Sequence, residues 1–185
     1  MGDYDQYHKL YKKAAHIKLV LTDCDGVLTD NGVYFSAVGE EMKRFSIRDG
    51  MGVERLRNLA KVEVGIVTGE NSMPVIRRAA KLNITELHLH SKDKVRTLLS
   101  ILDQTNLSAH EVAFIGDDVN DIPVMEMVGL SACPGDGMYD AKQVSDYVCH
   151  AKGGHGAFRE FAEFIIEAKK RAVFEKADAQ EAVQS

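Results

Sequence analysis

Short apolar runs of strand length alternate with longer segments of helical pattern along most of this chain. Strands are predicted at residues 17–22, 62–67, 86–89 and 112–115, with shorter ones at 130–132 and 147–149. This alternation is typical of a parallel sheet whose faces are covered by helices. The sequence therefore predicts an α/β fold. A length of 185 residues fits a single domain, and its core is expected at about 16–168.

One insertion interrupts this alternation after the first strand. Residues 33–36 and 42–46 have strand character and flank Gly39, which tolerates the positive φ of a tight turn. The segment is therefore predicted to be a β-hairpin that projects from the sheet.

Capping residues set the expected helix boundaries. Helices are expected at about 1–15, 52–61, 71–82, 91–104 and 121–128. Asn71, Ser91 and Asp121 are the predicted N-caps of the last three. Ser108 and Glu111 have the spacing of a capping box, although only a short turn fits there. A final helix carries an apolar stripe, after which residues 172–185 are predicted to be a frayed or flexible tail.

Carboxylates follow two of the predicted strands at the point where each strand ends. Asp23 and Asp25 follow the first strand, and Asp117, Asp118 and Asp121 follow the strand at 112–115. Because side chains alternate along an extended chain, Asp23 and Asp25 are expected to face the same way and share one cation or phosphate. A turn rich in Asp and Gly is the plainer interpretation of one such cluster. Two separate acidic strand ends favour a divalent metal site.

The remaining two strand ends also carry polar residues. Thr68 and Gly69 follow the second strand, and Lys94 lies beyond the third. Alone, the first pair reads as a turn, Lys94 as a solvated helix residue and Asp121 as a helix cap. Open α/β sheets bind ligands at the carboxyl ends of their strands, so the ordered placement on four strand ends favours catalytic use.

Charge and cysteine usage exclude several classes of function. A net charge of −5 offers no broad basic surface for a nucleic acid backbone, so a small molecule is the expected partner. Cys24, Cys133 and Cys149 show no Cys-x-x-Cys spacing, which fits free thiols in the cytoplasm. No segment resembles an export signal or approaches the ~20 apolar residues that span a bilayer, so no membrane partner is expected.

The four motifs in order, Asp-x-Asp-Gly-Val, Thr-Gly, Lys and Gly-Asp-Asp-x-x-Asp, resemble those of the haloacid dehalogenase superfamily of phosphotransferases over residues 17–167. The resemblance implies a Rossmann-like parallel sheet and Mg²⁺ as cofactor. The ion would be held by Asp23, Asp117 and the backbone carbonyl of Asp25. Asp118 and Asp121 would surround the metal ligands or orient Lys94.

The same resemblance assigns catalytic roles. Asp23 would attack phosphorus and become an aspartyl phosphate, while Asp25 would act as general acid and then as general base. Thr68 would donate its hydroxyl to the phosphate, and Lys94 would stabilise negative oxygens in the transition state. Cys24 suggests a thiol mechanism, but no histidine partner is identifiable, so it is interpreted as a packed side chain.

No cap domain fits between the motifs, because the intervals from Asp30 to Thr68 and from Gly69 to Lys94 are too short. The site is therefore expected to be open in a monomer, with a neighbouring subunit as its lid. This architecture is similar to the tetrameric phosphatases of 3-deoxy-D-manno-octulosonate 8-phosphate, which act in lipopolysaccharide sugar synthesis. The similarity implies a homotetramer, and it places Arg48 and Arg159 near the sugar acid.

One position beside Gly69 departs from the octulosonate pattern. Those phosphatases typically have arginine after Thr-Gly, whereas this chain has Glu70, with Lys81 as its expected partner. A Glu and a Lys at this spacing resemble phosphatases of nine-carbon sugar acids. The alternative substrates are therefore 2-keto-3-deoxynononate 9-phosphate or sialic acid 9-phosphate. A non-catalytic oligomerisation module is a further alternative, against which the intact Asp23 and Asp25 argue.

Overall fold

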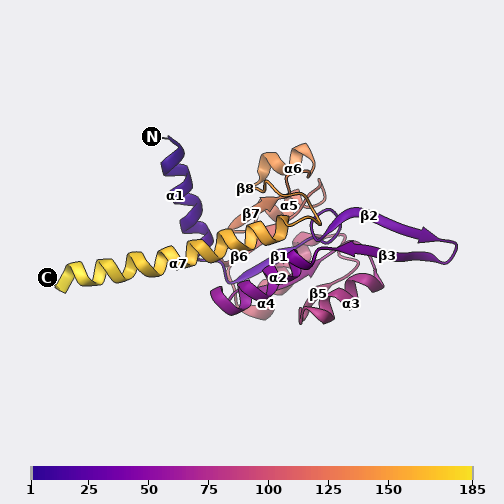
Figure 1. Ribbon diagram of the computed structural model, residues 1–185, viewed down its shortest axis with the longest axis horizontal. Helices are drawn as coiled ribbons and strands as arrows, with labels where there is room; N and C mark the ends of the chain where they lie inside the picture. Colours follow the sequence, from indigo (N-terminus) through magenta and orange to yellow (C-terminus); the bar gives the residue numbers. More distant parts are fainter. Residues whose placement is uncertain (1, 185) are drawn as a thin grey trace.

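A computed structural model describes the backbone of residues 2–184 and the side chains of residues 7–175. Six parallel strands form the central sheet (Figure 1). In sheet order they are β5 (Glu86–His88), β4 (Glu63–Val67), β1 (Leu19–Thr22), β6 (Val112–Ile115), β7 (Leu130–Cys133) and β8 (Tyr147–Val148). The predicted α/β fold with a parallel sheet is confirmed.

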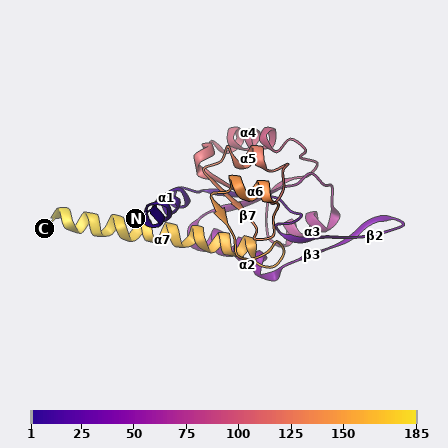
Figure 2. The same ribbon diagram turned by 90° about the horizontal axis from the view of Figure 1, so that it is seen from above.

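Helices cover both faces of the sheet, as Figure 2 shows. One face packs against α1 (Gly2–Ala15), α2 (Ile47–Arg55), α3 (Met73–Lys81) and α7 (Ala157–Gln184). The other face packs against α4 (Lys94–Thr105), α5 (Ile122–Met125) and α6 (Tyr139–Val144). Because side chains alternate along a strand, Val20 of β1 enters the first core while Leu21 enters the second. The central strands are therefore buried on both sides, as parallel sheets require.

The predicted hairpin is present and longer than expected. Its strands β2 (Thr29–Ser36) and β3 (Gly39–Phe45) pair antiparallel and project beyond the sheet (Figures 1 and 2). Gly39 supplies φ +111° at the tip. Phe35 is 73% exposed and Val38 is 88% exposed. No cap domain is inserted in the part of the chain that the structure describes. The carboxyl ends of the central strands are therefore left uncovered within one chain.

Helix α2 begins earlier than the sequence predicts. Its N-cap is Ser46, whose side chain accepts a hydrogen bond from the Asp49 backbone N–H at 3.3 Å. Gly50, inside this helix, serves close packing: a Cβ at this position would lie 2.5 Å from an Arg78 nitrogen. After α2 the chain passes through one π-helical turn, Leu56–Ala60, so the expected helix at 52–61 is only partly correct.

Two other predicted caps are wrong. Ser72 rather than Asn71 precedes α3, and Asp93 rather than Ser91 caps α4, accepting from the Arg96 N–H at 2.9 Å. Short polar side chains within a few residues of a helix start compete for the cap, and here the hydroxyl of Ser91 bonds Thr97 instead.

Further boundaries differ in smaller ways. The capping box of Ser108 and Glu111 is confirmed and opens a 3₁₀ turn, Ala109–Glu111. Helix α5 ends at Met125, sooner than predicted, and α6 was not predicted. The backbone of α7 stays helical through Gln184, where the sequence predicts a frayed tail from residue 172. Alanine, frequent there, has the highest helix propensity. No described helix combines the length and apolarity needed to cross a bilayer.

Candidate active site and metal centre

A cleft of about 180 Å³ opens at the carboxyl ends of β1, β4 and β6. Its lining includes most of the residues that the sequence singles out. The residues that line the cleft are Asp23, Asp25, Asn31, Thr68, Gly69, Glu70, Asp117, Asp118 and Asn120. A larger groove of about 740 Å³ lies between α1 and α7. Among the side chains that the structure describes, the acidic cluster lies at the smaller cleft and not in this groove, so chemistry is expected in the smaller cleft.

Three buried carboxylates meet at this cleft, two of which, Asp23 and Asp117, line it. Asp23, Asp117 and Asp121 each offer an oxygen within 4.8 Å of the other two. Gly26, at φ +84°, lets the loop after β1 approach Asp117, because a Cβ at this position would lie 2.0 Å from the Asp117 Oδ2. The glycine of the Asp-x-Asp-Gly motif is therefore needed for the cluster to form.

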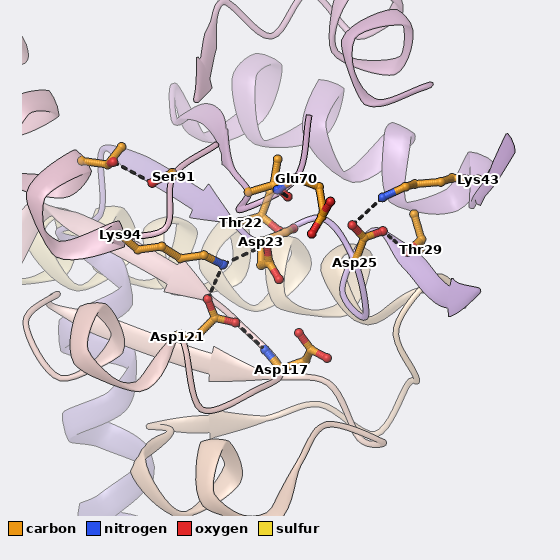
Figure 3. A network of polar contacts seen from close by, with 12 residues as sticks. Thr22, Asp23, Asp25, Thr29, Lys43, Glu70, Ser91, Lys94, Asp117 and Asp121 are labelled. Carbon is orange, nitrogen blue, oxygen red and sulfur yellow. Dashed lines mark hydrogen bonds and ion pairs between the residues drawn. The ribbon is translucent and has the colours of Figure 1, made fainter. Parts of the chain in front are cut away.

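Lys94 supplies a cation to this cluster, as Figure 3 shows. Its Nζ lies 2.9 Å from Asp23 Oδ1 and 2.5 Å from Asp121 Oδ1. Burial favours the neutral amine, but the charges and hydrogen bonds of Asp23 and Asp121 outweigh it and raise the pKa of Lys94. Asp121 also accepts from the Asp117 backbone N–H at 3.1 Å. Asp121 thus ties Lys94 to the loop that carries Asp117.

The cluster carries excess negative charge. Burial is the main cause that raises the pKa of Asp117 to about 8, and the charges of Asp23, Asp121 and Asp118 add to it. Burial also raises the pKa of Asp23, against the lowering effect of Lys94. If all three carboxylates were ionised beside the ammonium of Lys94, the excess negative charge would be neutralised by a dication. Hard carboxylate oxygens are the donors that Mg²⁺ prefers, so these residues fit that ion.

Asp25 does not join the cluster, which corrects the expectation that Asp23 and Asp25 face the same way. Strand β1 ends at Thr22, so alternation along an extended chain does not reach these residues. The Asp25 carboxylate instead faces the hairpin (Figure 3). Its Oδ2 lies 2.5 Å from Lys43 Nζ, and its Oδ1 accepts from the Thr29 hydroxyl at 3.2 Å.

Lys43 is the residue that sequence reasoning missed. Its side chain is fully buried, although it lies on a strand whose neighbouring residues Met42 and Arg44 are exposed. Burial favours the neutral amine, but the hydrogen bond and charge of Asp25 outweigh it and raise the pKa of Lys43. One lysine among polar hairpin residues gives no sequence signal of such burial. Only the folded hairpin brings residues 25 and 43 together.

The loop after β4 supplies a buried hydroxyl to the cleft. Thr68 is buried, and its Oγ1 accepts from the Glu70 backbone N–H at 3.2 Å. The hydroxyl proton stays available to a ligand, because that bond uses only an oxygen lone pair. Glu70 is exposed at the cleft wall.

Three predicted substrate residues lie away from this cleft within one chain. Arg48 is exposed in the first turn of α2, and Arg159 of α7 pairs with Glu163 at 2.7 Å. Lys81 is exposed at the far end of α3 and forms no ion pair with Glu70 among the described side chains, which corrects the expected pair. The physical reason is the helix itself, since eight residue steps at 1.5 Å separate the two ends of α3 by about 12 Å.

Cys24 is fully buried between the two acidic residues of the first motif. Burial raises its pKa well above the ordinary value, and the charge of Asp25 adds to this. A buried thiol of raised pKa is a poor nucleophile, so the interpretation of Cys24 as a packed side chain is confirmed.

A comparison with protein families places residues 65–160 in a family described as haloacid dehalogenase-like hydrolase. The 3-deoxy-D-manno-octulosonate 8-phosphate phosphatase of Haemophilus influenzae is 36% identical over 169 residues, covering 91% of this chain and 93% of that protein. The motifs that carry the resemblance therefore lie within a match that spans nearly the full length of both chains.

Solved structures agree with this match. The 3-deoxy-D-manno-octulosonate 8-phosphate phosphatase of Yersinia pestis has a TM-score of 0.85 at 36% identity, covering 88% of this chain and 87% of that one. The Moraxella catarrhalis enzyme of the same name was crystallised with a magnesium ion, a phosphate ion and a KDO molecule. It has a TM-score of 0.84 at 32% identity, covering 96% of this chain and 99% of that one.

Proposed function

This chain belongs to the haloacid dehalogenase-like hydrolases, and we propose that it is a Mg²⁺-dependent phosphatase of 3-deoxy-D-manno-octulosonate 8-phosphate. One observation carries the proposal. The buried cluster of Asp23, Asp117 and Lys94 stands beside a separate carboxylate, Asp25, in the cleft of a chain alignable over nearly its whole length with such phosphatases. The products are the free sugar acid and inorganic phosphate.

Asp23, Asp117 and the backbone carbonyl of Asp25 would hold the metal. When bound, Mg²⁺ supplies charge neutralisation between carboxylate and phosphate and fixes their approach. The need for this is large, because two like charges at ~4 Å repel by about 4 kcal/mol at an effective dielectric near 20. The H. influenzae relative has also been solved in a cobalt-bound form. Cobalt is therefore a useful probe of the same ligands.

In the first half-reaction, a carboxylate oxygen of Asp23 forms a bond to phosphorus as the bond to the sugar oxygen breaks. Asp25 donates its proton to that departing oxygen. Lys94, 2.9 Å from Asp23, keeps the nucleophile ionised, and with the hydroxyl of Thr68 it stabilises the phosphoryl oxygens. In the second half-reaction, Asp25 takes a proton from the water that cleaves the aspartyl phosphate.

Glu70 keeps a nine-carbon substrate as the alternative. It lines the cleft where the octulosonate phosphatases typically carry arginine, so its carboxylate would accept hydrogen bonds from sugar hydroxyls rather than bind an anion. Steady-state kinetics with octulosonate 8-phosphate and nononate 9-phosphate, run in parallel on wild type and Glu70→Arg, would decide between them. We expect a preference for the eight-carbon ester that increases with arginine. Equal efficiencies, unchanged by the substitution, would refute this specificity argument.

We propose further that the protein is a homotetramer and that it acts in the cytoplasm, in lipopolysaccharide sugar synthesis. The exposed hairpin supports the assembly. Tyr34, Phe35 and Val38 expose apolar surface on a projecting element, which favours burial between subunits. Assembly would also bring side chains from another subunit to an open cleft, and Arg48 and Arg159 are the candidates. Sedimentation equilibrium is expected to give a tetramer. A fully active monomer would remove this part of the proposal.

A further inference from the structure

Both oxygens of the Asp25 carboxylate are held by the hairpin rather than by the sheet. Lys43 of β3 lies 2.5 Å from Oδ2, and Thr29, the first residue of β2, donates to Oδ1 at 3.2 Å. Figure 3 shows the carboxylate directed toward these two residues and away from Asp121. The hairpin base therefore sets the orientation of a carboxylate that lines the cleft.

We propose that Lys43 is a positioning residue, which orients the carboxylate of Asp25 for proton transfer and couples it to the seating of the hairpin. The proposal rests on the proposed function, because it needs Asp25 as the general acid. It assigns Lys43 no contact with phosphate or metal.

The burial of Lys43 makes a purely structural role a weak explanation. Its ammonium group is fully buried and has two acidic neighbours, Asp25 and, at 3.4 Å, Glu40. A buried ion pair seldom contributes net stability, since desolvation offsets the attraction. The same pair at the edge of a cleft gives orientation, because a charged hydrogen bond fixes the direction of its partner.

The polar contacts of Lys43 also reach helix α3. Glu40 accepts a hydrogen bond from the hydroxyl of Ser72, the N-cap residue of α3. The chain Asp25–Lys43–Glu40–Ser72 therefore joins the loop after β1, the hairpin and the start of α3. A displaced hairpin would move Lys43 and with it the acid.

A comparison of two leaving groups separates a positioning role of Lys43 from a purely structural one, because a structural defect would lower kcat/KM for both esters alike. An alkyl oxygen, as in a sugar phosphate, departs with a proton from Asp25, whereas an aryl oxygen such as 4-nitrophenolate departs as a stable anion. The ratio kcat/KM covers only the steps through the first irreversible one, so it isolates the departure of this group from the later hydrolysis. Misplacing the acid should therefore affect only the alkyl ester.

The test compares Lys43→Met with wild type on octulosonate 8-phosphate and on 4-nitrophenyl phosphate. We expect kcat/KM for the sugar ester to fall by about 10–100-fold, the range typical when a residue that orients an active-site group is removed. The value for the aryl ester should fall by less than about 3-fold. Arg44→Met is the matched control, because Arg44 is the next residue of β3, is exposed and pairs with Asp30 instead. It should leave both values near wild type.

Thr29→Val provides a second variant that introduces no unpaired buried charge. It removes the other hydrogen bond to Asp25 and should shift the two esters in the same direction, by less. A crystal structure of Lys43→Met should show the Asp25 side chain rotated. Equal losses on both esters, or no loss on either, would overturn the proposal. Failure of the proposed function looks different, because wild type itself would then not hydrolyse octulosonate 8-phosphate, and both proposals would fall.

Discussion

Replacing Gly26 by alanine tests whether the glycine of the first motif exists to admit Asp117. The new Cβ would lie 2.0 Å from Asp117 Oδ2 and 2.4 Å from its Cγ, where ordinary contact begins at 3.4 Å. The carboxylate therefore has to retreat by more than an ångström. Mg²⁺ demands near-ideal octahedral geometry at about 2.0–2.1 Å from each oxygen, so such a retreat removes a ligand.

Two separate costs are expected from this substitution. Alanine at φ +84° adds backbone strain of about 1–2 kcal/mol, which should appear as a lower free energy of unfolding. The displaced carboxylate should weaken Mg²⁺ binding by at least about 10–100-fold, the range found when the surroundings of metal ligands are disturbed. Isothermal titration calorimetry measures the second cost, and urea unfolding measures the first.

Gly39→Ala is the matched control for backbone strain. Gly39 also has positive φ, at +111°, but a Cβ there would meet nothing within 4 Å. It should lose stability to a similar extent and keep the Mg²⁺ affinity of wild type. The reasoning fails if both alanine variants bind Mg²⁺ as tightly as wild type does.

Three further outcomes are expected. Asp23→Asn should lower phosphate release on the order of 10⁴-fold while circular dichroism still reports a cooperative melt; retained turnover would contradict its role as nucleophile. The folded pKa of Asp117, about 8, lies above its ordinary 3.8, so stability of the metal-free protein should fall as pH rises from about 4 to 8. Mg²⁺ binding should accordingly release protons near pH 7 and tighten toward pH 8, which calorimetry in two buffers detects. Lys94→Met leaves Asp23 and Asp121 without their cation, so metal-free unfolding should cost about 3–5 kcal/mol less; a change below about 1 kcal/mol would count against the buried pair.

The sheet could be predicted from the sequence because its signal is local. Runs such as Val112–Ile115 are apolar throughout, as strands buried on both faces must be. Turn chemistry was less decisive. Ser46, Ser72 and Asp93 are the N-cap residues of their helices, yet several polar residues near each helix start could have been the N-cap. Which of them caps the helix depends on which side chains form tertiary contacts instead.

The location of the acidic cluster was likewise predictable, since carboxyl ends of parallel strands share one edge of a sheet. The arrangement inside it was not. Asp121 lies against Lys94 and beside Asp23 and Asp117, as expected, but the expected pair of Glu70 and Lys81 is absent from the described side chains, and Asp25 faces the hairpin instead of the cluster. These outcomes depend on the conformation of the loops and the direction of the helices, which the hydrophobic periodicity of the sequence does not specify.

The residue types at four strand ends, and therefore the chemistry open to this chain, were determined by the sequence alone. The tertiary structure decided how two acids only one residue apart are used. Asp23 faces Lys94 and the acidic cluster, while Asp25 faces Lys43. The physical reason is that strand β1 ends before both, so the loop and the hairpin that folds over it, rather than strand alternation, set the direction of each side chain.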